Sequence, residues 1–575
     1  MAETLQIISE RVDDIPVLLA QLERMGVQPL LDEHFPTHGN WVGLSLGWVT
    51  VIWLTHILSE ANHRLNYVEP WAEQRLQTLR GCTGQPVQPL DVSDDRLAAV
   101  LEALSDDARW SVFEGVLNQH TLRVYDLGAT CVRLDSTTAN GHWTVTEDGL
   151  FQFGHSKDHR PDLPQVKIMV SALDPLGMPV TTDVVPGQRA DDPLYIPAIT
   201  RVREGLGRRG LLYVGDCQMG ALETRAFLQA GGDYYLCPLS ESQLPPAILV
   251  NYLAPVWTGA QAVTVIHRPQ PGSSPELIAE GFERQEPVTA EVAGQPYHWL
   301  ERRLVIRSVQ LAQAGERGLR ARLAKAQAEV TALNERRRGR RRYSGPSALR
   351  EAVDTILTRY RVHGLLHVWY KEQFWERPRR RYGGRDATMR LEWDGQVAVS
   401  LDQAAVAAAV RQLGWRVYVT TQPPDQLSLQ EAVLAYRNEY LVERAMGRLK
   451  GRPLSLTPMY LERDDHATGL IRLLSLGLRM LTLLEFEVRR RLALAKTRLS
   501  GLYVGHPKRA TARPTAERLL EAFQGLTLTI IREGRRRRRH LTQLSRVQQH
   551  VLALLAFPVD IYTRLCPDSH KPPEK

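Results

Sequence analysis

Two aspartates each follow a short apolar segment, and this placement is the first sign of chemistry in the sequence. Asp135 follows Cys-Val-Arg-Leu, and Asp216 follows Leu-Leu-Tyr-Val-Gly. Carboxylate oxygens are the ligands that hard divalent cations such as Mg²⁺ prefer in proteins. A third acid on a nearby helix would complete a site that activates water or a 3′-hydroxyl against a phosphodiester. Glu443 is the candidate, because it lies in the helix that follows the last predicted strand.

A less specific interpretation stays open for each aspartate taken alone. Asp135 could cap the turn that follows its strand, and Asp216 could begin the next loop. A metal site therefore requires that the two strands lie next to each other.

The pattern between residues 131 and 239 predicts an α/β unit that would bring the two aspartates together. Short apolar runs predict strands, and amphipathic stretches predict helices at 193–206 and 220–230. The predicted strands are 131–136, 166–173, 178–185, 211–216 and 234–239. The turn sequence Asp174-Pro-Leu-Gly makes the second and third of them a hairpin. If the first and fourth strands are neighbours, Asp135 and Asp216 converge at one point.

A further predicted strand, 415–421, precedes a long helix that begins near Ser428. Ser428 supplies the N-cap of this helix, and Glu431 completes a capping box. Tyr436, Glu443 and Lys450 follow at intervals of about two helical turns, so a continuous helix would present all three on one face.

The regions around this unit differ in pattern. Residues 1–125 and 467–557 are predicted to be helical. Between residues 240 and 410, short β-like runs and a basic helix at 317–333 interrupt the α/β series and indicate an insertion. The uncharged stretch 41–59 is almost long enough to span a bilayer. It contains Ser, Thr and His and lacks basic flanks, so we expect a buried core helix there.

Charge is distributed unevenly along the 575 residues, whose formal net charge is +8. Residues 1–125 hold 8 Arg, no Lys and 17 acids, a balance of −9, so the remainder carries +17. Arginine clusters occur at 336–342, 377–385 and 535–539. Runs this dense favour contact with a polyanion, although a solvated surface is the alternative.

Composition excludes several classes of protein. At 43% hydrophobic and 24% charged residues the chain has ordinary globular usage, and its length predicts three or four folding units. The five cysteines are scattered without a Cys-x-x-Cys pair, which argues against a disulfide scaffold or a structural zinc site. The N-terminus lacks a basic start followed by an apolar core. We therefore expect a cytoplasmic protein with no membrane partner.

These residues resemble the DDE-type transposases of bacterial insertion sequences, in particular the branch named IS-four. That branch carries a signature of Tyr, two residues, Arg, three residues, Glu, six residues and Lys. In the segment YRNEYLVERAMGRLK, Tyr436, Glu443 and Lys450 match it, and Glu439 stands at the Arg position. Arg437 and Arg444 lie close enough in sequence to take over a phosphate contact. The blocks LDSTT (134–138), GHSKDHRPDL (154–163), PGQRAD (186–191) and DDH (464–466) are also similar to the family.

The resemblance implies an α/β fold: an RNase H-like core, a mixed sheet with flanking helices, split by a β-rich insertion. It implies a helical N-terminal domain for end recognition or dimerisation at 1–125, the core in two parts at 126–240 and 411–500, the insertion at 241–410, and a helical basic C-terminal region at 501–575. The acidic balance of 1–125 is awkward for end recognition, because strong DNA readers are usually basic.

The resemblance also implies the chemistry. Asp135, Asp216 and Glu443 would hold two Mg²⁺ ions about 4 Å apart, with Mn²⁺ able to substitute. Tyr436, Arg437, Arg444 and Lys450 would contact DNA near the scissile bond. The partners would be double-stranded DNA, as transposon ends and target, and a second copy of the chain in a synaptic complex.

Two alternatives to a transposase remain at the level of sequence. One is a nuclease or resolvase on the same core that cuts DNA without strand transfer. The other is a catalytically silent DNA-binding descendant of a transposase, which the Glu439 departure keeps open.

Overall fold

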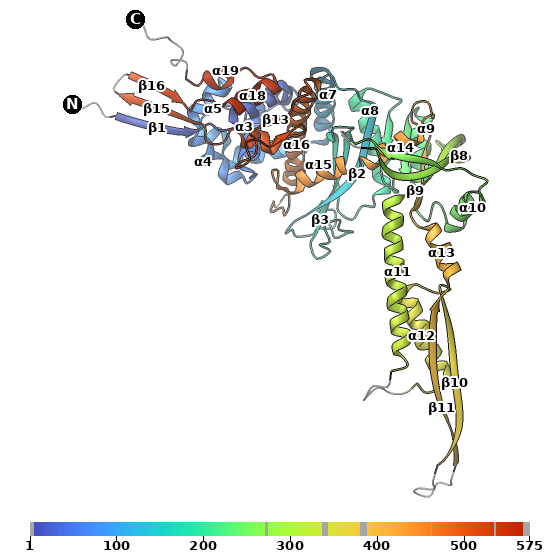
Figure 1. The fold of residues 1–575 in the computed structure, drawn as a ribbon. Helices are drawn as coiled ribbons and strands as arrows, with labels where there is room; N and C mark the ends of the chain where they lie inside the picture. The colour runs from blue at the N-terminus through green and yellow to red at the C-terminus, as the bar shows by residue number, and fades with distance from the viewer. Residues whose placement is uncertain are drawn as a thin grey trace.

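A nine-stranded mixed sheet forms the centre of the molecule (Figure 1). The computed structural model describes residues 5–270, 274–335, 343–379, 388–461, 463–533 and 536–566. The strand order is β4-β3-β2-β5-β6-β12-β9-β8-β7. The strands are β2 (Cys131–Asn140), β3 (Gln165–Leu173), β4 (Met178–Pro186), β5 (Leu212–Val214), β6 (Tyr234–Pro238), β7 (Thr264–Arg268), β8 (Glu276–Val292), β9 (Gln295–Ser308) and β12 (Trp415–Thr420).

The first half of this sheet has the predicted order of elements. β3 and β4 form the expected antiparallel hairpin, and β2 lies parallel to β5, which lies parallel to β6. Helices α8 (Tyr195–Leu206) and α9 (Leu222–Ala230) connect the strands. The first and fourth predicted strands are therefore neighbours, as the convergence of Asp135 and Asp216 requires.

The strands that follow residue 240 continue the same sheet. After α10 (Pro246–Trp257), β7, β8 and β9 pair in sequence, and β9 pairs with β12. β12 in turn pairs antiparallel with β6. The sheet is thus extended sideways by the β-rich segment.

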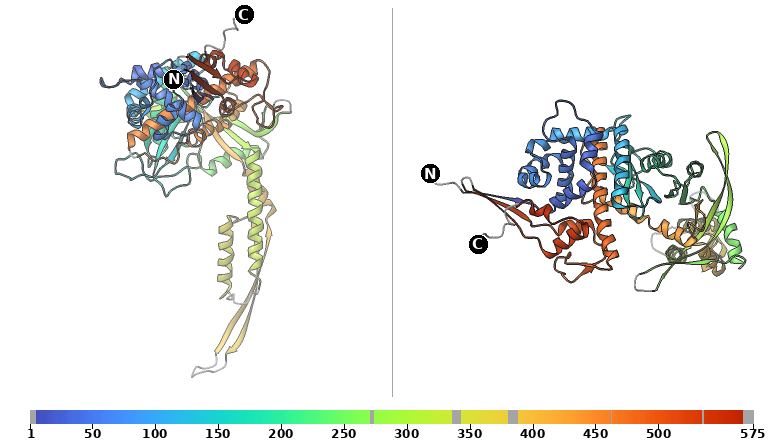
Figure 2. Two further views of the ribbon diagram at one scale, coloured as in Figure 1. Left: turned by 90° about the vertical axis from the view of Figure 1, so that its left-hand side faces the viewer. Right: turned by 90° about the horizontal axis from the view of Figure 1, so that it is seen from above.

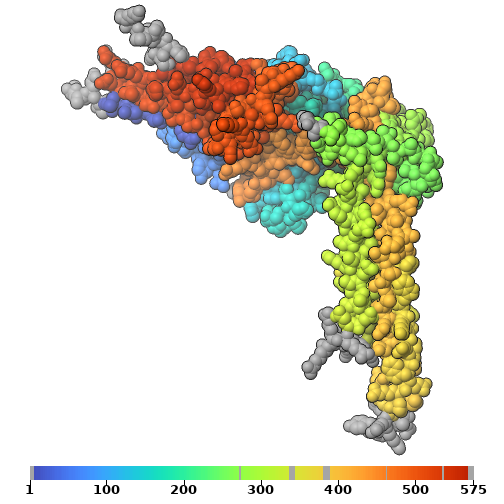
Figure 3. All heavy atoms as spheres, viewed as in Figure 1, coloured from blue at the N-terminus to red at the C-terminus, as the bar shows by residue number. Residues whose placement is uncertain are grey.

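A long arm projects from the sheet between β9 and β12 (Figures 1 and 3). It consists of α11 (Val309–Ala332), α12 (Pro346–Tyr360), the hairpin β10 (Leu366–Arg379) and β11 (Thr388–Leu401), and α13 (Gln403–Gln412). The Ser308 amide donates to the Gly414 carbonyl at 2.9 Å, so the arm leaves and rejoins the sheet at one point. The arginine cluster 336–342 and residues 380–385 of the second cluster lie outside the described residues.

A helical body packs against the sheet and surrounds α16 (Asp464–Leu494) (Figure 2). Its helices are α1 (Ile15–Arg24), α2 (Val27–His34), α3 (Leu46–Glu60), α4 (Val68–Glu73), α5 (Leu76–Thr83), α6 (Asp94–Ser105) and α7 (Asp107–Tyr125), with short turns at η1 (Leu65–Tyr67) and η2 (Pro89–Val92). The prediction of a core helix in the apolar stretch 41–59 is confirmed from Leu46 onward, because α3 is buried along most of its length, whereas residues 41–45 precede the helix. α16 is long and apolar enough to cross a membrane, yet 94% of its apolar window is buried in this body.

The two ends of the chain meet in a small sheet, which the sequence did not indicate. β1 (Leu5–Arg11) pairs with β15 (Thr527–Glu533), which pairs with β16 (Arg536–Leu541). The prediction of helix throughout 467–557 is wrong here, because Thr-Leu-Thr-Ile-Ile alternates β-branched residues that favour a pleated strand. Arginines 536–539 lie on β16, and Arg535 is outside the described residues. The remaining C-terminal elements are β13 (Leu499–Ser500), β14 (Ala510–Thr511), α17 (Ala516–Glu521), α18 (Arg546–Leu555) and α19 (Asp560–Thr563).

The predicted long helix after β12 is two helices, α14 (Leu429–Arg437) and α15 (Tyr440–Lys450). The capping box of Ser428 and Glu431 is confirmed at the start of α14. At its end the Asn438 amide donates to the Ala435 carbonyl and the Glu439 amide to the Tyr436 carbonyl, at 3.2 and 3.1 Å, so the last turn tightens to a three-residue spacing. The buried Arg133 of β2 also donates to the Ala435 carbonyl, which fixes this break against the sheet.

Candidate active site

Asp135 lies in β2, and Asp216 lies just beyond the end of the adjacent parallel strand β5. Arg133 of β2 is in register with Val214 of β5, and each aspartate lies two residues beyond its member of that pair. Side chains two residues apart on a strand point to the same face. The two carboxylates are therefore brought together by strand pairing, as the sequence predicted.

The environment of Asp135 disfavours its negative charge. Burial raises the pKa of Asp135 to about 6, Lys157 lowers it, and the nearby negative charge of Asp216 raises it. The Lys157 ammonium lies 3.5 Å from Asp135 Oδ1 and donates to the carbonyl and hydroxyl oxygens of Ser136 at 2.6 and 2.8 Å. The same ammonium lies 3.6 Å from Asp191 Oδ2. Lys157 is thus the cation that balances this carboxylate in the described structure.

Asp216 is held in place by donors from its own neighbourhood. The Tyr195 hydroxyl of α8 donates to Asp216 Oδ1 at 2.7 Å, and the Gln218 amide donates to the same oxygen at 2.9 Å. Burial raises the pKa of Tyr195 well above its usual value, and the charge of Asp216 raises it further. Tyr195 therefore stays protonated and remains a donor to Asp216.

Two acids, Glu439 and Glu443, lie near the α14–α15 junction. The partly buried one is Glu439, not the Glu443 that the sequence indicated. Glu439 is partly buried, and it lines a small cavity with Asp135 and Tyr436. Burial raises the pKa of Glu439, and the negative charges of Asp135, Glu443 and Asp216 raise it further. Glu443, one turn along α15, is exposed. The position where the resemblance expects arginine therefore carries a carboxylate that faces the aspartate pair.

This set of side chains suits a hard divalent cation by its chemistry. All the acidic donors are carboxylate oxygens, which Mg²⁺ and Mn²⁺ prefer. Burial raises the pKa of both Asp135 and Glu439; the charge of Asp216 raises that of Asp135 further, and the charges of Asp135, Glu443 and Asp216 raise that of Glu439 further. Within the described residues no three acidic, histidine or cysteine side chains are close enough together to enclose one ion. The two aspartates therefore form an open pair, and an acid from the start of α15 must come closer to complete a metal site.

The four residues expected to contact DNA are each engaged within the protein. Lys450 forms an ion pair with Asp158, and Arg444 forms one with Glu485 of α16. Arg437 donates to the Ile278 carbonyl and the Ser308 hydroxyl, both at 3.0 Å, and so ties α14 to β8 and β9. Tyr436 packs on Tyr418, with ring centroids 4.6 Å apart. Because α14 and α15 are separate helices, Tyr436 does not share one continuous helix face with Glu443 and Lys450.

Three residues of the site were not identified from the sequence. Lys157 and Asp158 contact Asp135 and Lys450, and their block, GHSKDHRPDL, was the available signal. Tyr195 gave no signal, because a tyrosine at the start of an amphipathic helix is an ordinary core residue.

Comparison with known proteins gives a family match and distant likenesses to solved structures. No curated protein sequence matches the chain. A solved structure described as a piggyBac transposase synaptic complex with hairpin DNA aligns with 11% sequence identity and a TM-score of 0.24. The alignment covers 51% of this chain and 63% of that one, so this chain spans less than two thirds of its length.

The family assignment comes from the sequence itself. Residues 119–480, more than half of the chain, match the family described as "Transposase DDE domain". This range includes both aspartates, Glu439, Glu443 and Lys450. Membership implies nuclease and transesterase chemistry, for which DDE transposases generally use divalent metal ions. The predicted resemblance to a DDE transposase is confirmed, and the chain belongs to the transposase DDE domain family.

Proposed function

We propose that this protein binds the terminal inverted repeats of its own mobile element, cuts the DNA there and joins the freed ends to a target. The observation that carries the proposal is the register of β2 and β5, which sets Asp135 beside Asp216 next to the acidic start of α15. A DDE transposase needs such a carboxylate set on a rigid sheet, and an RNase H-like core is the arrangement we infer for it.

Asp135 and Asp216 would bind two Mg²⁺ ions together with an acid of α15, and Mn²⁺ would substitute. The ions would supply activation of water or a 3′-hydroxyl and neutralise the charge that develops on the phosphate. Lys157 balances Asp135 before the metal arrives, since it is the ammonium that contacts this carboxylate. Tyr195 keeps Asp216 oriented through its hydroxyl.

The third carboxylate is either Glu443 or Glu439. The spacing to Lys450 favours Glu443, the residue that the family signature names. The partial burial of Glu439 and its closeness to both aspartates favour Glu439. We propose Glu443 as the metal ligand and Glu439 as the acid that adds negative charge to the same site.

The remaining residues of the signature would act on DNA once it is bound. Lys450 would leave its ion pair with Asp158 and bind a phosphate near the scissile bond. A phosphate is the stronger hydrogen-bond acceptor, because it offers more charged oxygens than one carboxylate. Arg437 and Arg444 are engaged by the sheet and by Glu485, so we propose that they position α14 and α15 for DNA contact. Cutting both ends requires two copies of the chain on the DNA, as a homodimer.

The test is a cleavage assay on a plasmid that carries the gene's own flanking DNA, with Mg²⁺ or Mn²⁺. Glu443→Gln removes one charge at nearly constant shape, so we expect cutting at both flanks to fall by at least about 100-fold while DNA binding persists. Glu439→Gln should reduce cutting less than tenfold. Glu223→Gln, an exposed acid of α9, is the matched control and should cut like the wild type.

Three other results would change the proposal. Loss in Glu439→Gln with normal cutting in Glu443→Gln would assign the third ligand to Glu439. Scattered nicking that ignores the flanks would indicate a nuclease or resolvase. Binding without cutting in every protein, wild type included, would indicate a catalytically silent descendant.

A further inference from the structure

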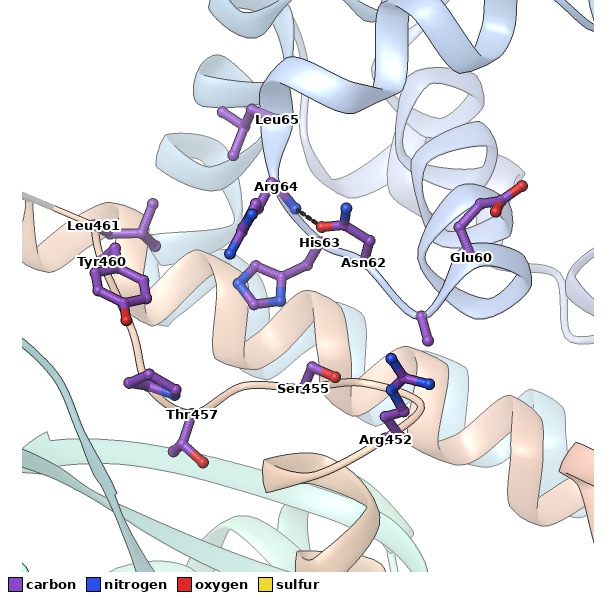
Figure 4. Close-up of a pocket in the computed structure, with 12 residues that line it drawn as sticks. Glu60, Asn62, His63, Arg64, Leu65, Arg452, Ser455, Thr457, Tyr460 and Leu461 are labelled. Atoms are coloured by element: carbon purple, nitrogen blue, oxygen red, sulfur yellow. Dashed lines mark hydrogen bonds between the residues drawn. The ribbon is translucent and has the colours of Figure 1, made fainter.

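A large cavity lies between the helical body and the loop that joins α15 to α16 (Figure 4). Its volume is about 800 Å³, within the ~300–1,000 Å³ typical of ligand sites. One wall is the turn 60–65 after α3, and the other is formed by residues of the segment 452–461. The two walls are distant in sequence, so the cavity exists only in the assembled fold.

The charge of the cavity is positive. Arg64 and Arg452 line it and are exposed, and in the described ranges neither guanidinium forms an ion pair. Glu60 is the acid among the lining residues, and it is already engaged by Arg75 and the Trp71 indole at 3.0 and 3.1 Å. His63 contributes a buried Nδ1 that has no hydrogen-bond partner within the described structure. Two arginines are thus left to bind an anion.

An exposed aromatic platform stands at the edge of this cavity. The rings of Tyr460 and His142 are stacked, with centroids 5.6 Å apart and planes inclined by 13°. Tyr460 is 64% exposed although it is a large ring, and it lines the cavity. His142 lines a second cavity of about 820 Å³, which shares Leu461 with the first. The stacked pair therefore separates two hollows and leaves ring surface open to solvent.

The cavity is rigidly connected to the elements of the candidate active site. The Met459 amide donates to the Asn140 carbonyl at the end of β2, and the His142 amide donates to the Met459 carbonyl, at 3.2 and 3.3 Å. The Thr457 amide donates to the Lys450 carbonyl at the end of α15, also at 3.3 Å. The loop is thus fixed to the strand of Asp135 and to the helix of Glu443.

We propose that this cavity binds an unpaired strand of DNA, with its phosphates on Arg64 and Arg452 and a base on the ring of Tyr460. Proteins bind single strands by combining a basic groove with aromatic faces, because every base offers a face for stacking. The inference rests on the proposed function and deepens it, since it assigns a place for a strand that has left the duplex, on a loop that is hydrogen-bonded to β2 and α15.

The first experiment measures fluorescence anisotropy of a labelled twelve-nucleotide oligothymidylate with the full chain. Tyr460→Ala should weaken binding by roughly 5- to 100-fold, the range expected for the loss of one stacked base. Tyr460→Phe keeps the ring and should stay within about twofold of wild type. Tyr67→Ala removes a tyrosine that is 48% exposed in the same turn region but outside the cavity lining, and it should bind like the wild type. Arg64→Ala with Arg452→Ala should reduce the salt dependence of binding.

A second measurement does not depend on how a variant folds. Wild-type protein is irradiated with an oligonucleotide that carries 5-iodouracil, and the crosslinked peptide is mapped. Crosslinking at Tyr460 or His142 supports the proposal. Crosslinks confined to the arm, or equal binding by wild type and Tyr460→Ala, overturn it while leaving the flank-cleavage result of Glu443→Gln intact. If the wild type does not bind the oligonucleotide at all, the inference fails, and cleavage at the flanks decides separately whether the proposed function stands.

Discussion

Asp135 is the residue in which structure and expected chemistry are most directly linked. Its folded pKa of about 6 lies above its ordinary value of 3.8. Because the folded state holds the proton more tightly, this group stabilises the metal-free fold fully below about pH 4, and the contribution is lost as pH rises through 6. The difference amounts to about 3 kcal/mol in the free energy of unfolding.

A divalent cation should reverse this trend, since it takes the place of the proton. We expect the melting temperature to rise on addition of Mg²⁺ at pH 7.5 and to change little at pH 5, where Asp135 is protonated. Asp135→Asn should remove both the loss of stability between pH 4 and 6 and the Mg²⁺ response. Thermal unfolding followed by circular dichroism measures both. A Mg²⁺ shift of equal size in Asp135→Asn would show that the ion binds elsewhere.

The aspartates were predictable from sequence, whereas their supporting residues were not. Asp135 and Asp216 each follow an apolar run that is recognisable as a strand, although β2 continues past Asp135 to Asn140 and β5 ends two residues before Asp216. The parallel pairing of β2 and β5 follows from the order of the elements. Lys157 reaches Asp135 from a loop, and Tyr195 reaches Asp216 from a helix. Such contacts depend on loop path and side-chain direction, which neither periodicity nor spacing encodes.

At the scale of elements, α16 and α6 cross so closely that only a glycine fits at their contact. A Cβ on Gly469 of α16 would lie 2.1 Å from the Leu101 carbonyl oxygen of α6, which is backbone and cannot rotate away. Gly469→Ala should therefore push the helices apart and lower the free energy of unfolding by about 1–3 kcal/mol.

Gly447 of α15 is the matched control for this substitution. It is also helical, but a Cβ there would meet no described atom within 4 Å. Gly447→Ala should raise the free energy of unfolding by up to about 1 kcal/mol, because alanine loses less backbone entropy in a helix. Urea denaturation measures both variants, and equal effects of the two would contradict the close crossing.

Elements were predicted well where a local pattern agreed with the tertiary structure. The β3–β4 hairpin and the capping box of α14 are examples, because a turn sequence and a cap are local signals. The break between α14 and α15 was missed, since the apolar periodicity continues through it while the buried Arg133 takes up the Ala435 carbonyl. β1 was missed because its partner β15 comes from the other end of the chain.

At the scale of the molecule, the chain forms a body and an arm with separate apolar cores. The core of the arm is made by residues between 319 and 413. Outside the arm, one large core runs from α1 to the C-terminal helices, and two smaller clusters lie on the outer half of the sheet. β1 and the hairpin of β15 and β16 lie at the end of the body away from the arm (Figure 1). The burial of apolar surface therefore stabilises the body and the arm largely independently of each other.

Excision of the arm tests this independence. Ser308 and Gly414 are hydrogen-bonded neighbours at the ends of β9 and β12, so residues 309–413 can be replaced by the two-residue hairpin turn Asn-Gly. We expect the shortened chain to unfold cooperatively, with a melting temperature within about 5 °C of the wild type. It should also keep its affinity for oligothymidylate, because no lining residue of the Tyr460 cavity lies in the arm. A longer excision, 295–413, is the control: it removes β9, leaves β12 without that partner and should prevent folding. Loss of cooperative unfolding in the shorter excision as well would mean that the arm is an integral part of the sheet's stability.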